Sequence, residues 1–147
     1  MPQYIEMPAG IRPTVPVSRP AVTALVGDVL AILAFVVTGL HSHGMRAWEV
    51  PVHTLETLAP FLIAWAVIAP LAGVYHRETL TRYRLTVPLV TLAWVVAAVL
   101  GTQLRATAYF PGNAPLVFVL VSVAVGTLCL LPLRVATVWY WRRGDPR

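Results

Sequence analysis

Residues 21–40, AVTALVGDVLAILAFVVTGL, decide the fold of this chain. Asp28 is the one charged side chain among these twenty residues. An α-helix of this length spans a hydrocarbon core of about 30 Å. The stretch therefore predicts a first membrane-crossing helix that carries a carboxylate inside it.

The apolar side chains of this stretch outweigh the carboxylate. Its eleven Val, Leu, Ile and Phe residues favour insertion by roughly 3–7 kcal/mol, whereas one Asp near the centre of a span costs about 3 kcal/mol. We therefore expect the helix to insert with Asp28 in place.

The composition of the whole chain agrees with a membrane protein. Of its 147 residues, 58% are hydrophobic and only 12% are charged, against about 25% charged in soluble domains. All eleven basic residues are arginine. The absence of lysine excludes chemistry that depends on a Schiff-base lysine or a P-loop lysine.

Three further apolar runs follow, at about residues 57–75, 85–104 and 114–133. Together with the first span they predict an all-α membrane protein, with four transmembrane helices in an up-down bundle within residues 21–141. Residues 1–20 contain five prolines and predict a flexible cytoplasmic tail. Residues 142–147 form a second short tail.

The arginines predict the orientation in the membrane. Four spans place both termini on one side, and that side then holds nine arginines, whereas Arg46 and Arg105 lie on the other. Arginine and lysine are enriched on the cytoplasmic side of membrane proteins. We therefore expect both termini in the cytoplasm and the protein in the cell (inner) membrane.

Small residues in the spans predict close packing between helices. In the first span they recur at steps of three and four beside Asp28, and they are Ala24, Gly27, Ala31, Ala34 and Thr38. Later spans contain two pairs of small residues four apart, Ala97 with Gly101 and Ser122 with Gly126.

The second span contains Pro70 in its inner half. A proline inside a helix leaves the carbonyl four residues earlier, here that of Ala66, without its usual donor. Pro70 therefore predicts a kink, and Ala66, Ala69 and Gly73 offer a small face beside it.

Asp28 and Arg134 are expected at the same depth. Asp28 lies about eight residues, or roughly 12 Å, from the cytoplasmic end of its helix. Arg134 lies eight residues before Arg142 on a helix that runs the opposite way. A pair of opposite charges would clasp the first helix to the fourth. Without a partner, Asp28 would instead be a candidate proton-coupling carboxylate.

Gln103 and Arg105 close the third span at its outer end. Arg105 could receive an anionic headgroup or substrate near Tyr109 and Asn113. The ordinary alternative is an arginine that snorkels from a helix end towards the interface.

Motifs for catalysis or for a cofactor are missing from the spans. Ser122 is the only serine within them, and no second aspartate is present there for an aspartyl dyad. His41, His43 and His53 fall in the connection at residues 41–56, outside the spans and without a known zinc spacing. We expect no enzymatic activity, metal, cofactor or nucleic-acid partner.

Five short motifs resemble one family of small prokaryotic membrane proteins, called domain of unknown function 3054. They are GDV at 27–29, APFLIAW at 59–65, APLAGVY at 69–75, LRAT at 104–107 and YFPG at 109–112. The resemblance covers residues 21–140 and implies a four-helix membrane protein, with no established activity or ligand. The positions that match the pattern are Asp28, Trp65, Pro70, Gly73, Tyr75 and Arg105.

Two functions remain open from the sequence. The first is a non-enzymatic subunit or assembly partner in the lipid bilayer, in a homo-oligomer or with another membrane protein. The second is a small oligomeric transporter or ion path that uses Asp28 to couple protons.

Overall fold

The computed structural model describes residues 18–143, and every regular element within them is a helix. The helices are α1 (Arg19–Ser42), α2 (Pro51–Leu71), α3 (Arg77–Thr81), α4 (Tyr83–Arg105) and α5 (Leu116–Arg143). Four of them, α1, α2, α4 and α5, are long and apolar enough to cross a membrane and indicate a membrane protein. The tail positions 1–17 and 144–147 lie outside the described residues.

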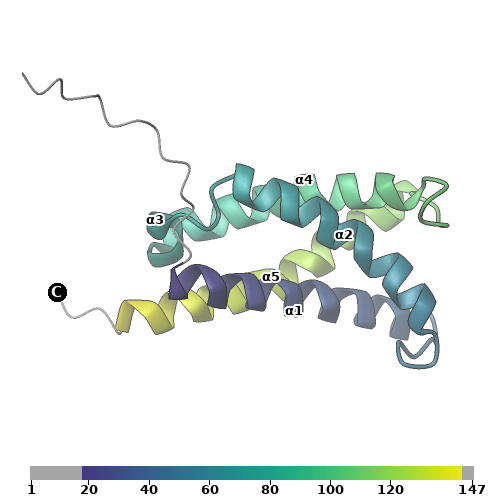
Figure 1. Cartoon of the computed structure of the whole chain (residues 1–147), viewed down its shortest axis with the longest axis horizontal. Coiled ribbons are helices and arrows are strands. Elements are labelled where there is room, and N and C mark those ends of the chain that lie inside the picture. The colour runs from purple at the N-terminus through teal and green to yellow at the C-terminus, as the bar shows by residue number, and fades with distance from the viewer. Residues whose placement is uncertain (1–17, 144–147) are drawn as a thin grey trace, which may run out of the picture.

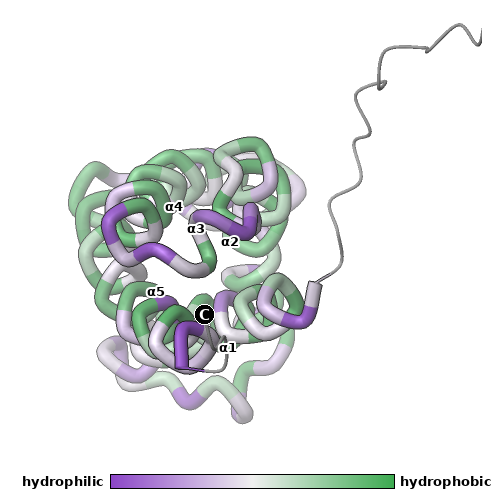
Figure 2. Tube along the Cα trace, turned by 90° about the vertical axis from the view of Figure 1, so that its left-hand side faces the viewer, coloured by the Kyte–Doolittle hydropathy of each residue, from purple (hydrophilic) through white to green (hydrophobic). Residues whose placement is uncertain are grey.

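The four long helices form an elongated bundle (Figure 1). α2 packs mainly on α4, α4 on α5 and α5 on α1, and a smaller contact between α1 and α2 closes the ring. Figure 2 looks along the bundle and shows α1 and α5 on one side and α2 and α4 on the other. The start of α1 and the end of α5 lie at the same end, close to α3.

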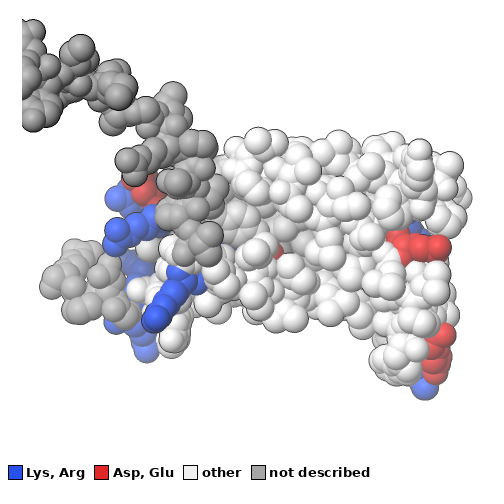
Figure 3. Space-filling model, viewed as in Figure 1, with Lys and Arg blue, Asp and Glu red and all other residues white. Residues whose placement is uncertain are grey.

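Charged side chains gather at the two ends of the bundle. Figure 3 shows a broad, nearly uncharged band between them. The shortest of the four long helices, α2, has 21 residues, and at about 1.5 Å per residue it covers the hydrocarbon thickness. Figure 2 shows that the tube of the four long helices is coloured mostly as hydrophobic.

Aromatic side chains fill the centre of the bundle. Phe35 of α1 meets Phe61 of α2 edge to face at a centroid distance of 5.1 Å, and it meets Trp94 of α4 at 5.8 Å. Phe61 and Trp94 stack at 6.1 Å. These three rings are at most 5% exposed, so they tie three helices together at one level.

Two glycines allow the helices to approach these rings. A Cβ at Gly101 would lie 2.7 Å from Phe61 Cδ1, and a Cβ at Gly126 would overlap the indole of Trp94. The Trp94 indole also donates a hydrogen bond to the Ser122 carbonyl at 3.2 Å. The two expected small pairs, Ala97 with Gly101 and Ser122 with Gly126, are therefore buried at close helix contacts.

The small stripe expected on α1 is only partly correct. Ala24 and Ala31 are buried, whereas Gly27 is half-buried and Ala34 and Thr38 are exposed. The misplaced residues lie roughly a third of a turn around the helix from the centre of the buried face. That face continues instead through larger side chains, namely Ile32, Phe35 and Val36.

The ends of several helices differ from those expected. α2 begins at Pro51 rather than residue 57, so His53 belongs to a helix and not to a loop. α5 continues to Arg143, ten residues beyond the end of the expected span at residue 133, and Arg134 lies inside a helix as expected. The connection at residues 76–84 contains α3, one short helix.

The second helix ends closer to Pro70 than expected, and the kink at Pro70 stays a prediction. α2 ends at Leu71, so Pro70 lies in its last turn. The small face expected there is also incomplete, since Ala69 is buried but Ala66 is exposed.

The contact between Gly126 and Trp94 can be tested by adding one methyl group. We expect Gly126→Ala to lower the free energy of unfolding by about 1–3 kcal/mol, because the methyl overlaps a rigid ring. Gly27→Ala is the control. Nothing lies within 4 Å of its added Cβ, and Ala favours a helix over Gly by about 0.5–1 kcal/mol. Unfolding in mixed micelles, followed by tryptophan fluorescence, measures both. Equal losses would contradict the close contact.

Candidate functional site

Asp28 lies on the buried face of α1. It follows Ala24 by four residues and precedes Ile32 by four, and all three positions are buried. Residues four apart share one side of a helix. The sequence therefore directs the carboxylate into the bundle, where its side chain is 2% exposed.

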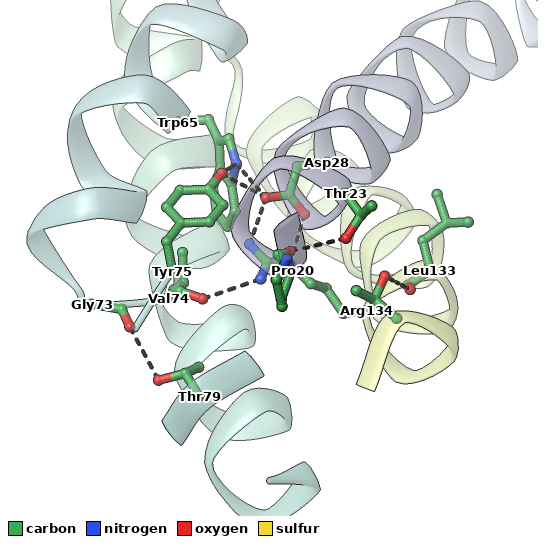
Figure 4. Close-up of polar contacts among 11 residues, drawn as sticks. Pro20, Thr23, Asp28, Trp65, Gly73, Val74, Tyr75, Thr79, Leu133 and Arg134 are labelled. Carbon is green, nitrogen blue, oxygen red and sulfur yellow. Dashed lines mark hydrogen bonds and ion pairs between the residues drawn. The ribbon is translucent and has the colours of Figure 1, made fainter. Parts of the chain in front are cut away.

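Arg134 of α5 meets Asp28 inside the bundle, as the matching depths predicted (Figure 4). The Arg134 Nε donates to Asp28 Oδ1 at 2.7 Å, and Nη2 donates to Oδ2 at 2.5 Å. Two parallel hydrogen bonds of this kind hold a guanidinium and a carboxylate in one relative orientation. The pair joins the first and last helices of the bundle.

Two aromatic side chains complete the surroundings of Asp28. The hydroxyl of Tyr75 donates to Asp28 Oδ2 at 2.7 Å, and the indole of Trp65 reaches the same oxygen at 3.1 Å. The Trp65 indole also lies 3.1 Å from the Tyr75 hydroxyl. α2 is thus attached to the charged pair through Trp65. We call Asp28, Arg134, Trp65 and Tyr75 the buried network.

A tight turn after α2 positions Tyr75. Gly73 has a φ of +72°, its N–H bonds to the Pro70 carbonyl at 3.0 Å, and the Val74 N–H bonds to the Ala69 carbonyl at 3.1 Å. This pattern is a Schellman motif, in which a left-handed residue ends the helix. The turn explains why Gly73 stands two residues before Tyr75.

The same turn supplies a backbone group to the buried network. The Val74 carbonyl accepts a hydrogen bond from Arg134 Nη1 at 3.1 Å. The guanidinium carbon of Arg134 also lies 4.9 Å from the centre of the Tyr75 ring. Each of the three guanidinium nitrogens therefore has an acceptor.

Tyr75 acts as a hydrogen-bond donor. It lies outside the four long helices, and burial, together with the neighbouring Asp28, raises the pKa of its hydroxyl above the ordinary value. A raised pKa keeps the hydroxyl protonated at neutral pH. The Tyr75 hydroxyl therefore links the turn after α2 to Asp28 as a hydrogen-bond donor.

Arg105 and Gln103 lie at the opposite end of the bundle from α3. Gln103 is exposed, whereas Arg105 is half-buried, and its guanidinium carbon lies 4.9 Å from the centre of the Phe118 ring. Arg105 also lines a cavity with Asn113, while Tyr109 is 89% exposed. Arg105, Tyr109 and Asn113 were considered together from the sequence. Of these three residues, Arg105 and Asn113 line the same cavity.

One surface ion pair lies in the connection between α1 and α2, and a contact between a histidine and a glutamate lies in the first turns of α2. Arg46 Nη1 lies 3.2 Å from Glu49 Oε1, and His53 Nδ1 lies 3.9 Å from Glu56 Oε2. Within residues 18–143, no three His, Cys, Asp or Glu side chains gather as a possible metal site.

Some residues of these sites were not identified from sequence reasoning alone. Trp65 and Tyr75 stood out only through the family resemblance, and the role of the Val74 carbonyl was missed. A buried indole N–H needs an acceptor. This requirement could have pointed from Trp65 to the carboxylate of Asp28. At the other end, Thr57, Phe118 and the wall formed by Phe35 were also missed as neighbours of Arg105.

Comparison with known families relates the chain to one of them. The family described as Protein of unknown function (DUF3054) matches residues 25–137, a range that contains the whole buried network. Neither the curated proteins nor the solved structures gave a match. Since the match covers most of the chain, the protein belongs to the DUF3054 family, which its sequence motifs resemble.

Proposed function

We propose that this protein is a multi-pass protein of the cell membrane, with both termini in the cytoplasm. In this proposal it acts without catalysis, as a subunit or assembly partner of another membrane-protein chain. The buried network gives the bundle its fixed shape, and an outer face of the bundle contacts the partner.

The proposal rests on the hydrogen bonds that occupy both carboxylate oxygens of Asp28. Both carboxylate oxygens accept hydrogen bonds from Arg134, and Oδ2 also accepts from Tyr75 and Trp65. A proton-coupling carboxylate must exchange its proton with water on each side of the membrane. A carboxylate that is 2% exposed and held by a cation favours a structural role.

The distribution of arginine supports cytoplasmic termini. Arg134 no longer counts as an interfacial charge because it is buried in the bundle. Six described arginines still lie at the end that holds the start of α1 and the end of α5, and they are Arg19, Arg77, Arg82, Arg84, Arg142 and Arg143. Arg46 and Arg105 lie at the other end. Arginines therefore remain more numerous at the end that holds the start of α1 and the end of α5, as expected for the cytoplasmic side.

A groove between α1 and α5 supports contact with a second chain. Its lining includes four small residues, Thr23, Gly27, Ala136 and Thr137, beside larger apolar and aromatic side chains. The backbone at Gly27 faces open space, since nothing lies within 4 Å of its Cβ position. Small residues let the backbone of another helix approach closely in a membrane.

The orientation can be tested with single cysteines in a Cys129→Ala background. We expect His43→Cys to react with a membrane-impermeant maleimide in intact cells. Arg77→Cys, at the other end of the bundle, should react only after the membrane is permeabilised. Labelling in the reverse order would contradict cytoplasmic termini.

Asp28 separates the structural role from proton-coupled transport. We expect Asp28→Leu to lower the free energy of unfolding by about 3–5 kcal/mol, because it leaves Arg134 buried without a counter-charge. Asp28→Asn should cost less, about 1–3 kcal/mol, since its amide oxygen still accepts a hydrogen bond. Unfolding in mixed micelles measures both losses.

The same Asp28→Asn variant tests transport directly. Wild type and Asp28→Asn in proteoliposomes should give equal proton movement under an imposed pH gradient. A pH-driven flux that the wild type supports and the folded Asp28→Asn variant abolishes would favour a transporter over the proposed role.

The groove predicts a contact that a larger side chain would block. Gly27→Leu should reduce chemical cross-linking of the protein to a second chain in native membranes by severalfold. Ala34→Leu is the matched control, because Ala34 is exposed on the same helix but lies outside the groove. Native mass spectrometry then distinguishes a second copy from another protein. The absence of any cross-linked product from wild type would contradict a role as a subunit.

A further inference from the structure

A cavity of about 270 Å³ opens at the end of the bundle that holds Arg105. α1, α2 and α5 form its walls, and Arg105 and the following loop form one side of its mouth. Its volume lies just under the range of about 300–1,000 Å³ that drug-sized ligands occupy. The space therefore suits a small molecule.

The cavity reaches well below the helix ends. Thr57 lies six residues after the start of α2, and Ser122 lies six residues after the start of α5. At about 1.5 Å per residue, both lie roughly 9 Å into the bundle. Phe35 of α1 lies at a similar distance from the end of its helix. These residues form the floor, whereas Arg105, Asn113 and His43 lie near the mouth.

The mouth of the cavity is positively charged. Arg105 has no hydrogen-bond acceptor or ion-pair partner within residues 18–143, and no Asp or Glu lines the cavity. Its side chain is held in place by Phe118 and by close approach of the loop at Gly112, where a Cβ would lie 2.9 Å from Arg105 Nε. A guanidinium positioned in this way, with free donors, recognises carboxylate or phosphate.

The floor contains two polar atoms that need a partner. The hydroxyls of Thr57 and Ser122 are buried and have no hydrogen-bond partner within the described residues. Thr57 is 7% exposed and Ser122 is 0% exposed. A buried hydroxyl without a partner costs about 1–3 kcal/mol. Both residues line the same cavity, so a polar group that reached their hydroxyls would satisfy them.

We propose that this cavity binds a small anionic molecule with an apolar body. Arg105 contacts the anionic group at the mouth, and Phe35, Val36 and Phe118 surround the body. Thr57 and Ser122 contact a hydrogen-bonding group at the inner end. The anion can come from a free solute or from the headgroup of a membrane lipid. This site is independent of the proposed role of the buried network.

Binding of three related probes tests the proposal. The full chain is placed in phosphatidylcholine nanodiscs and titrated calorimetrically with 6-hydroxyhexanoate, hexanoate and 1,6-hexanediol. We expect the first to bind most tightly, because it alone carries both the anion and the inner hydroxyl. Failure of both carboxylates to bind wild type, or binding no tighter than that of the diol, would overturn the proposal.

Variants assign the two polar contacts. Arg105→Gln should weaken binding of both carboxylates by about 10- to 100-fold, as expected for the loss of a charged hydrogen bond. Arg105→Lys should lose less. Arg46→Gln is the matched control, because Arg46 lies at the same end but outside the cavity. Equal effects of Arg105→Gln and Arg46→Gln would overturn the role of Arg105.

The floor has its own pair of variants. Thr57→Val and Ser122→Ala should remove the preference for 6-hydroxyhexanoate over hexanoate while hexanoate still binds. An unchanged preference would overturn the contact at the floor. Near-ultraviolet circular dichroism of the buried tryptophans checks that each variant is folded.

A final comparison identifies the source of the anion. Phosphatidylglycerol is added to the nanodiscs, and the apparent affinity for 6-hydroxyhexanoate is measured again. Competition that depends on Arg105 assigns the site to a lipid headgroup, and the absence of competition assigns it to a free solute. Competition that persists undiminished in Arg105→Gln would overturn Arg105 as the anion contact.

Discussion

The pairing of Asp28 with Arg134 is the constraint on which the rest of the bundle depends. Each of these charges loses several kcal/mol of hydration when it leaves water, so neither is stable alone among apolar side chains. The contact of 2.5 Å between Arg134 Nη2 and Asp28 Oδ2 fixes the depth and rotation of α1 relative to α5. Trp65 and Val74 then attach the end of α2 to the same point. Apolar packing alone discriminates weakly between helix registers in lipid, whereas a charged pair at one level strongly favours a single register.

The sequence predicted the spans and the charged pair for simple physical reasons. Apolar length identifies helices that can cross a membrane, and counting residues from the helix ends placed Asp28 and Arg134 at one depth. Rotation about the helix axis was harder to predict. Residues on both faces of α1 are apolar, so Gly27 and Ala34 looked as suitable for packing as Ala24 and Ala31. The predicted set of residues around Asp28 was incomplete for a different reason. Tyr75 and the Val74 carbonyl reach it through the turn at Gly73, and that geometry is not visible in a hydropathy pattern.

Within the part of the chain that the structure describes, polar groups are paired in the buried network but unpaired in the cavity near Arg105. In the buried network the donors and acceptors of Asp28 and Arg134 are matched inside the protein, which makes that region rigid and closed. In the cavity near Arg105, a cation and two hydroxyls have no partner among residues 18–143. Unsatisfied polar groups are costly in a packed interior. The contrast separates a region that maintains the fold from one that is suited to binding.

The distance along the chain between Asp28 and Arg134 has a consequence for biosynthesis. The two residues are 106 positions apart, and α1 therefore emerges from the ribosome well before α5. A nascent chain therefore carries its carboxylate towards the bilayer long before the matching guanidinium exists. Until α5 is complete, the Asp28 carboxylate lacks this partner, and other polar surroundings such as the insertion machinery have to accommodate it. The pair of Asp28 and Arg134 consequently cannot form until α5 has been made, and a product terminated before Arg134 would lack the partner of Asp28.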